Sequence, residues 1–381
     1  MNSNTIFAER PQFTKKQDSG FLISIILLIG LGLITLYISS SGSALRIKGD
    51  RLHFVKRQLI YFSIGLAFML AASFISLKFI KKILPFLTLA VIILCCLTFL
   101  PGIGVTLNGA RRWIKFPLIG RFQPSEIVKP VIVLFLANIF SKEHREGFEP
   151  VTRAAMMLFF FVFLVILQDD FSTAFFLMVI GLVMFFVSGT KIHWFVAFCV
   201  LTIPVGFLFI FRESYRVNRL IAFFNHGFDL HGLNYQVNMS RRAIAAGGFW
   251  GKGVNGYLRA VNSIPEVQAD FIFAGWVEAM GFIGVLLYFA LLIYFAFKGF
   301  TASVKCVDKF NVLTSFGLIS CILIQSLLNV GVVSGALPST GIPLPFFSSG
   351  GSSLIVTMLM CGLIFNTFRT DNKMKMESLY E

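Results

Sequence analysis

Two carboxylates, Glu266 and Asp270, close a polar stretch with the sequence Asn262-Ser-Ile-Pro-Glu-Val-Gln-Ala-Asp-Phe-Ile-Phe-Ala274. Directly after them, residues 271–297 form an almost wholly apolar run, long enough for a helix that crosses a bilayer. A carboxylate at such a boundary could accept a proton as a general base, or it could cap the free N–H groups of a helix start. If the first helical turn begins at Asp270, the two carboxylates could share one face. Position alone leaves both roles open for Asp270.

Cationic side chains are concentrated in two stretches between apolar runs. Their positions are Arg111, Arg112, Lys115 and Arg121 in the first stretch and Arg212, Arg216, Arg219, Arg241, Arg242, Lys252 and Arg259 in the second. Guanidinium and ammonium groups bind phosphate and pyrophosphate well, and they also contact anionic lipid headgroups. The cations accompany other unusual loop features that headgroup binding does not require. We therefore favour an anionic ligand.

Further charged residues lie within or beside apolar runs. Lys129 stands one turn inside an expected span, where a lysine is either functional or paired, and Glu126 three residues earlier is an available partner. The adjacent carboxylates of Gln168-Asp-Asp-Phe-Ser-Thr173 form a tight polar turn, for which a hairpin cap is the simpler explanation. Glu278 lies about 12 Å deeper along its helix than Asp270, so it is either a functional group or a buried hydrogen-bonding group.

The composition identifies the elements that must position these residues as membrane helices. Of 381 residues, 56% are hydrophobic and only 13% are charged, about half the charged share of a soluble protein. We expect an all-α, polytopic integral membrane protein with about ten transmembrane helices. The expected spans are residues 20–40, 57–77, 82–100, 126–141, 152–168, 172–187, 193–211, 271–297, 310–331 and 351–368. The polar start precedes a run too long for the hydrophobic region of a cleavable signal peptide.

The distribution of charge predicts how the spans are oriented. An even number of spans places both termini on one side, and basic residues at both ends and in the short loops of that side indicate the cytoplasm. The net charge of +15 thus indicates membrane orientation and not nucleic-acid binding. The cationic stretches then lie outside, where orientation does not explain them. The predicted organisation is a cytoplasmic tail 1–19, a membrane domain 20–369 with outer loops 101–125, 212–270 and 332–350, and a cytoplasmic tail 370–381.

Three outer segments have distinctive compositions. Residues 108–126 are amphipathic and are expected to lie on the outer membrane surface. Four glycines between Gly247 and Gly253 could form a flexible hinge or a backbone nest for phosphate oxygens. The prolines of 329–353 exclude a regular helix, yet the segment carries apolar side chains, so it should dip back and line a groove. Those side chains are Leu337, Leu344, Phe346 and Phe347.

The six cysteines, at positions 95, 96, 199, 306, 321 and 361, lie in or beside expected spans without metal-ligand spacing. They are expected to be free packing residues.

Taken together, these stretches resemble the SEDS (shape, elongation, division and sporulation) family, which comprises FtsW, RodA and SpoVE. The resemblance extends from Phe54-Val-Lys-Arg-Gln58 to Gly350-Gly-Ser-Ser353. Its most specific parts are Asn108-Gly-Ala-Arg-Arg-Trp-Ile114, Arg121-Phe-Gln-Pro-Ser-Glu126, Pro265-Glu266 with Asp270-Phe-Ile-Phe-Ala274, and Leu337-Pro through Ser353. Several independent motifs in the right order make a chance match very improbable.

The resemblance implies a peptidoglycan polymerase that transfers glycosyl groups between lipid II molecules at the outer face of the bacterial cytoplasmic membrane. Asp270 would act as the catalytic base, cations would stabilise the leaving pyrophosphate, and a divalent cation such as Mg²⁺ or Mn²⁺ could share that task. An apolar groove would hold the prenyl chain among membrane lipid. The implied protein partners are a class B penicillin-binding transpeptidase and other division proteins. Candidate substrate-binding residues are Arg111, Arg112, Trp113, Arg121, Glu126, Lys129, Asp170, Arg216, Arg219, Gln236, Ser240, Glu266, Glu278 and Ser348.

This chain departs from the family pattern in places. It has Gln168-Asp-Asp-Phe-Ser-Thr173 where the family has QPDxGT, Gln268-Ala269 where it has His-Thr, and Val277-Glu278-Ala-Met-Gly281 where it has Glu-Glu-Leu-Gly. The intact Asn-Gly-Ala-Arg-Arg-Trp and Phe-Val-Lys-Arg-Gln stretches favour a division-type, septal role over elongation. A flippase of lipid-linked precursors and a scaffold for the transpeptidase remain alternatives. A flippase would depend on Glu278 more than on Asp270.

Overall fold

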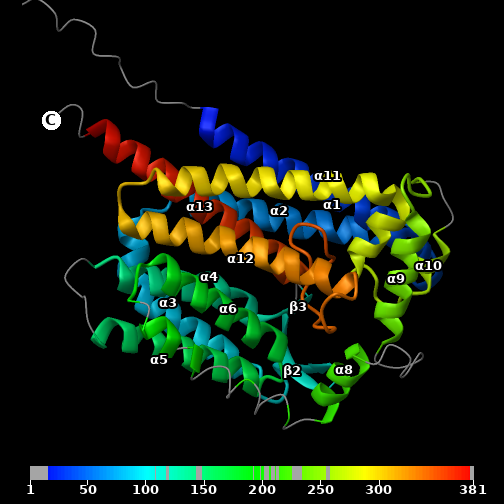
Figure 1. The fold of residues 1–381 in the computed structure, drawn as a ribbon, viewed down its shortest axis with the longest axis horizontal. Helices are drawn as coiled ribbons and strands as arrows, with labels where there is room; N and C mark the ends of the chain where they lie inside the picture. The colour runs from blue at the N-terminus through cyan, green and yellow to red at the C-terminus, as the bar shows by residue number, and fades with distance from the viewer. Residues whose placement is uncertain are drawn as a thin grey trace, which may run out of the picture.

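Long apolar runs of the sequence become long helices that lie side by side (Figure 1). The computed structural model describes residues 16–107, 109–116, 120–142, 148–191, 193–197, 199–200, 206, 211, 214–224, 234–254 and 258–377. The long helices are α1 Lys16–Lys48, α2 His53–Phe74, α3 Leu77–Leu97, α4 Pro124–Phe140, α5 Phe148–Leu167, α6 Phe171–Val187, α11 Ile272–Val304, α12 Lys309–Val333 and α13 Gly351–Glu377.

These helices coincide with nine of the ten expected spans, and most of the expected span 193–211 lies outside the described residues. Seven helices among the described residues are long and apolar enough to cross a membrane. Helices α4 and α6 are shorter, with 17 residues each. A polytopic, predominantly helical membrane architecture is therefore confirmed, whereas the count of ten spans stays a prediction.

The short elements gather at one end of the bundle, while α1 begins and α13 ends at the other (Figure 1). This arrangement agrees with an even number of spans. The short elements are α8 Ser214–Phe224, α9 Tyr235–Gly247, α10 Arg259–Asn262, β1 Gly104–Leu107, β2 Ala110–Phe116 and β3 Gly120–Phe122.

The three strands form an antiparallel sheet in the order β1-β2-β3, within the segment expected to lie on the membrane surface. The sheet was not predicted. Leu107 pairs with Ala110 across a two-residue connection in which Gly109 has a φ of +83°. The Asn-Gly dipeptide at this connection is a typical hairpin signal, and it could have revealed the sheet.

Close contact between helix backbones depends on glycine. Helix α2 packs along α13, and α1 packs along α11. A Cβ atom at Gly362 of α13 would lie 2.3 Å from the carbonyl oxygen of Met69 in α2, so no larger residue fits there without a backbone shift. Small residues that let helices approach closely are typical of membrane bundles.

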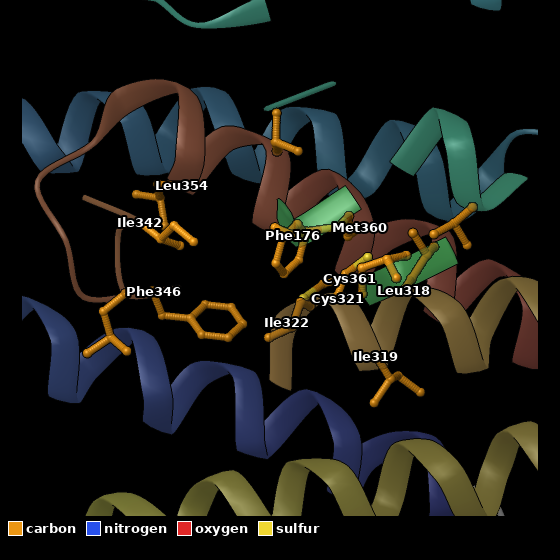
Figure 2. Close-up of a cluster of buried hydrophobic side chains, with 14 of the residues drawn as sticks. Phe176, Leu318, Ile319, Cys321, Ile322, Ile342, Phe346, Leu354, Met360 and Cys361 are labelled. Carbon is orange, nitrogen blue, oxygen red and sulfur yellow. The ribbon is translucent and has the colours of Figure 1, made fainter. Parts of the chain in front are cut away.

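The segment 334–350, which joins α12 to α13, folds back into the core as predicted (Figure 2). Leu344, Phe346 and Phe347 are buried, although Leu337 is exposed, contrary to expectation. Buried amides satisfy the irregular backbone of the segment: Gln325 donates to Pro343 O at 2.9 Å and Asn329 donates to Ile342 O at 2.8 Å. Non-helical backbone is tolerated at this depth because protein groups pair with it.

All six cysteines are free, in agreement with their expected packing role. Three of them, Cys95, Cys321 and Cys361, are buried, and Cys96 is exposed on α3.

Candidate functional site

Asp270 lies at the end of the bundle where the short elements gather, immediately before α11. The N-cap of α11 is Phe271, and no side chain donates or accepts a capping hydrogen bond there. The capping interpretation of Asp270 is therefore wrong. The two carboxylates do not share a helical face, because residues 263–270 form turns and bends before α11 and Glu266 has a φ of +50°.

The Asp270 carboxylate is only partly accessible, and it has no hydrogen bond or ion pair within the described chain. Its backbone oxygen accepts a hydrogen bond from Asn329 Nδ2 at 2.8 Å, which ties the residue to α12. Its Oδ2 faces the 334–350 segment, since a Cβ atom placed on Gly341 would lie 3.3 Å from it. The backbone of Asp270 is thus fixed while its carboxylate is left open.

Burial raises the pKa of Asp270 from 3.8 to about 6. Arg112 and Arg219 act in the opposite direction, whereas the negative charges of Glu266 and Asp170 raise the pKa further. A carboxyl group with this pKa is mostly ionised at neutral pH, and it is a stronger base than an ordinary aspartate.

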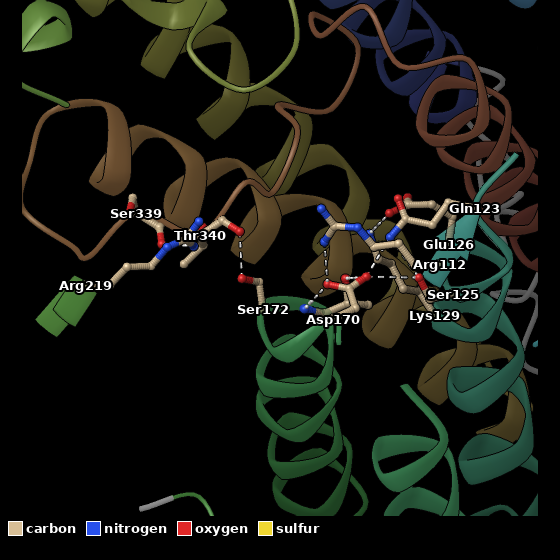
Figure 3. A network of polar contacts seen from close by, with 11 residues as sticks. Arg112, Gln123, Ser125, Glu126, Lys129, Asp170, Ser172, Arg219, Ser339 and Thr340 are labelled. Carbon is tan, nitrogen blue, oxygen red and sulfur yellow. Dashed lines mark hydrogen bonds and ion pairs between the residues drawn. The ribbon is translucent and has the colours of Figure 1, made fainter. Parts of the chain in front are cut away.

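Asp170 is the opposite case, a buried carboxylate with many partners (Figure 3). It caps α6 by accepting from Thr173 N at 3.3 Å and from Thr173 Oγ1 at 2.9 Å. Gln123 Nε2 donates to it at 2.6 Å, Ser125 Oγ at 3.3 Å, and Arg112 Nη1 pairs with it at 3.3 Å. The predicted hairpin cap is therefore present, and it also joins α6 to β2 and the start of α4.

Lys129 is buried and pairs with Glu126 at 2.7 Å, the partner that its spacing suggested. Its Nζ also donates to Gln325 Oε1 at 2.9 Å and lies 5.1 Å from the ring centre of Phe176. These contacts connect α4, α12 and α6, so the lysine inside the expected span is paired.

Two contacts hold the 334–350 segment beside the site (Figure 3). Arg219 Nη1 donates to Ser339 O at 2.9 Å, and Ser172 Oγ donates to Thr340 O at 2.6 Å. These carbonyls precede Gly341, so α8 and α6 together fix the backbone that faces Asp270.

The cations of the sheet differ in exposure. Arg111 and Arg121 are exposed, whereas Arg112 and Trp113 are half-buried. The side chain of Arg216 lies outside the described part of the structure. Arg112 and Arg219 are thus the candidate cations that the structure places in the electrostatic field of Asp270.

Of four other candidate residues, three bind backbone groups. Gln236 donates to Pro265 O at 3.1 Å, buried Ser240 donates to Val333 O, and Ser348 Oγ accepts from Leu344 N at 2.7 Å. Glu266 is exposed at the surface near Asp270. The first three therefore shape the loops around the site.

Glu278 is fully buried and pairs with Lys252 Nζ at 2.7 Å. Lys252 belongs to the glycine-rich stretch, whose backbone bonds to α11. Lys252 N donates to Glu278 O at 3.0 Å, and Gly253 N donates to Ala279 O at 2.9 Å. Two of the N–H groups that a phosphate nest would need are therefore already paired with α11.

Several residues that build the site were not among the candidates, although Gln123 and Gly341 lie within motifs that carry the family resemblance. Gln123, Gln325, Asn329 and Gly341 act through contacts with distant segments. Only the burial of polar residues in expected spans could have suggested Gln325 and Asn329. Among the described residues, no group of three or more His, Cys, Asp or Glu side chains is arranged to hold a metal ion.

Comparisons with known proteins agree on one family. The FtsW/RodA/SpoVE family model, described as "Cell cycle protein", matches residues 19–373. A protein of Geobacter metallireducens named "Probable peptidoglycan glycosyltransferase FtsW" is 32% identical over 358 residues, covering 92% of this chain and 94% of that relative. A protein of Borreliella burgdorferi with the same name is 35% identical over 350 residues, covering 91% and 95%.

Solved structures share the fold. A chain from a peptidoglycan synthase complex that coordinates polymerization and crosslinking superposes with a TM-score of 0.76 at 26% identity, covering 93% of this chain and 98% of that chain. The rod shape determining protein RodA of Thermus thermophilus superposes with a TM-score of 0.69 at 23% identity, covering 92% and 96%.

Proposed function

The chain belongs to the FtsW/RodA/SpoVE family, and on that premise we propose how it works as a peptidoglycan glycosyltransferase. It polymerises lipid II into glycan strands at the outer face of the cytoplasmic membrane, and its relatives favour the division-type role over elongation. The observation that carries the mechanism is the Asp270 carboxylate, which is held in place by its backbone, lacks a partner within the described chain and has a pKa of about 6.

Asp270 acts as the general base. It accepts the proton of the acceptor sugar hydroxyl while that oxygen attacks the anomeric carbon of the donor sugar. A new C–O bond forms, and the bond from the anomeric carbon to the pyrophosphate oxygen breaks. The leaving group departs as lipid-linked pyrophosphate with its electron pair, and the proton stays on Asp270 until solvent removes it.

Arg112 and Arg219 are the cations best placed to stabilise the negative charge that develops on the pyrophosphate, because both lie near enough to Asp270 to lower its pKa. Arg111 and Arg121, exposed on the sheet, contribute to attracting the anionic substrate. A divalent cation would supply the same stabilisation of charge.

The protein acts with a crosslinking partner at the division septum, with both termini in the cytoplasm. Support comes from the similar chain that belongs to a synthase complex of polymerization and crosslinking. The partner that fits is a single-pass class B penicillin-binding transpeptidase, which crosslinks the strands that this chain makes.

Polymerisation by the purified protein tests the function. Wild-type protein in detergent, given lipid II alone, should produce glycan strands that are visible on a gel. Detergent provides no second compartment, so a flippase would show no product, and a scaffold would require its enzymatic partner. Absence of polymer both alone and with the transpeptidase would contradict the proposal.

Cysteine labelling tests the orientation. Single cysteines in place of Val254 and Lys373, in a background without the six native cysteines, should react with a membrane-impermeant reagent from opposite sides. Val254 is exposed at the end where the short elements gather. Labelling of both positions from the same side would contradict the orientation.

A further inference from the structure

Helix α11 breaks at Gly281, where the backbone has a φ of 62° and a ψ of −158°. A break in a helix leaves backbone groups without intrahelical partners. Here the segment 247–253 supplies them on both sides of the break. The bonds are Lys252 N to Glu278 O at 3.0 Å, Gly253 N to Ala279 O at 2.9 Å, Phe282 N to Gly248 O at 3.0 Å and Ile283 N to Phe249 O at 3.3 Å.

Glycine is required for this docking because the two backbones touch. A Cβ atom would lie 2.2 Å from Val277 O at Gly247, 2.2 Å from Ala279 O at Gly251 and 2.4 Å from Gly251 N at Gly281. Gly251 and Gly281 also have positive φ angles of 79° and 62°. The outer loop is thus fitted into the break in α11 at one defined position.

A buried ion pair extends this contact. The Glu278 carboxylate is 0% exposed, and its Oε1 lies 2.7 Å from Lys252 Nζ of the docked segment. Its Oε2 accepts a hydrogen bond from the backbone N–H of Val261 at 2.9 Å, in the short helix α10. One carboxylate therefore joins three parts of the molecule: α11, the docked segment and α10.

The chain runs from α10 directly to Asp270. Val261 and Val267 are buried, which fixes the path of this stretch. Neighbouring elements bind its backbone as well: Tyr235 Oη donates to Ser263 O at 3.2 Å, and Ser349 N donates to Gln268 O at 2.7 Å. The position of α10 is therefore transmitted to Asp270 through a short segment that the buried Val267 and these hydrogen bonds hold in place.

We propose that Lys252 and Glu278 are positioning residues for catalysis, which hold α10 and the following segment so that the Asp270 carboxylate meets the acceptor hydroxyl. This inference rests on the proposed role of Asp270. It assigns to Glu278 a task without substrate contact, because both of its oxygens are occupied by protein donors. Removing Lys252 leaves a buried, uncompensated charge, which the loop relieves by moving.

The test replaces the lysine by an uncharged side chain of similar length. In Lys252→Met, kcat for polymerisation should fall roughly ten- to a hundred-fold, the effect of misplacing a catalytic group by about 1 Å. The KM for lipid II should stay within about twofold, since no substrate contact is lost. Lys252→Arg should retain most of the activity. The double variant Lys252→Met/Glu278→Gln should be more active than Lys252→Met, because it contains no unpaired carboxylate.

Lys81→Met is the matched control. Lys81 also pairs with a carboxylate, that of Asp308, and its side chain is 34% exposed against 35% for Lys252. Lys81 belongs to α3 and Asp308 precedes α12, away from the short elements, so replacing Lys81 should leave kcat near the wild-type value.

A second readout does not depend on activity. A cysteine in place of Val267, which is 1% exposed, should react slowly with a thiol reagent in the otherwise wild-type loop and at least several-fold faster when Lys252→Met is added. If Lys252→Met speeds the labelling but the wild-type protein does not polymerise lipid II, the result supports the role of Lys252 in holding the segment and contradicts the proposed function.

Wild-type kcat and unchanged labelling in Lys252→Met would overturn the proposal, as would a variant Glu278→Gln whose only defect is a raised KM. If Lys252→Met does not accumulate, the double variant decides the matter. The proposal then requires that the kcat of the double variant lies below the wild-type kcat and that its labelling rate lies above the wild-type labelling rate.

Discussion

Two carboxylates of the same end of the molecule, Asp170 and Asp270, differ in almost every respect. Asp170 is buried and accepts bonds from Arg112, Gln123, Ser125 and Thr173. Asp270 is partly accessible, and its carboxylate is without a partner in the described residues.

The difference supports the proposal that Asp170 builds the site and that Asp270 reacts. Asp170 is occupied by the donors that join α6 to β2 and α4, whereas the Asp270 carboxylate has no donor among the described residues, and its burial raises its pKa and makes it a better base. Arg112 connects the two carboxylates: it pairs with Asp170, and its charge lowers the pKa of Asp270 from a distance. Asp170 thus holds Arg112 in place, and Arg112 in turn lowers the pKa of Asp270, the proposed base.

Replacing Asp270 should have the largest effect on activity. Asp270→Asn should lower the polymerisation rate roughly 10²- to 10⁴-fold, the usual contribution of general-base catalysis. It should not lower the melting temperature at pH 7. The raised pKa means that ionisation reduces the free energy of unfolding as the pH rises from 3.8 to about 6, and asparagine removes that cost. A rate above about a tenth of wild type would remove Asp270 from the mechanism.

Lys129→Met should have the largest effect on stability. It leaves the buried Glu126 carboxylate unpaired, which typically costs about 3–5 kcal/mol. Thermal unfolding in detergent should show a much lower melting temperature, and Glu126→Gln in the same chain should restore part of it. Lys56→Met is the control, since the Lys56–Asp50 pair is exposed and such surface pairs contribute little to stability. Equal shifts in both variants would contradict the role of burial.

Asp170→Asn should reverse the pattern expected for Asp270→Asn. The amide keeps the shape but loses the Arg112 ion pair and places an NH₂ group among donors, at a cost of about 1–3 kcal/mol in stability. The melting temperature should fall more clearly than the turnover of the molecules that remain folded. A larger loss of turnover than in Asp270→Asn would invert the assignment of the two carboxylates.

Gly341→Ala should produce the smallest effect. Gly341 and Gly335 both have a φ of +76°, so alanine strains either backbone by a similar amount, about 1 kcal/mol. Only at Gly341 does the new methyl group face Asp270 Oδ2, while at Gly335 it meets the flexible side chain of Arg241. The polymerisation rate should therefore fall several-fold in Gly341→Ala and less in Gly335→Ala. Equal rates would mean that the segment does not shape the environment of Asp270.

The sequence predicted what depends on local pattern. Apolar runs gave the long helices, and the spacing of Glu126 and Lys129 gave their ion pair. The buried 334–350 segment followed from prolines combined with apolar residues. The position of Asp270 just before a long helix followed from the apolar run after it, whereas the turn that contains Glu266 has no clear local signal.

The remaining features depend on contacts between distant segments. Arg112 meets Asp170 and Lys252 meets Glu278 only because the helices bring them together. The glycines at 247 and 251 are explained by the break at Gly281, which neither stretch reveals by itself. The sheet was missed because strong apolar runs on both sides dominated the pattern of a short polar hairpin.

The pH dependence of polymerisation tests the role of Asp270 most directly. With purified protein and lipid II, kcat/KM should be flat above about pH 7 and fall about tenfold per pH unit below a midpoint near the Asp270 pKa of about 6. The residual activity of Asp270→Asn should lack this inflection, because asparagine does not titrate. A wild-type profile without the inflection, or the same inflection in Asp270→Asn, would contradict the assignment of Asp270 as the base.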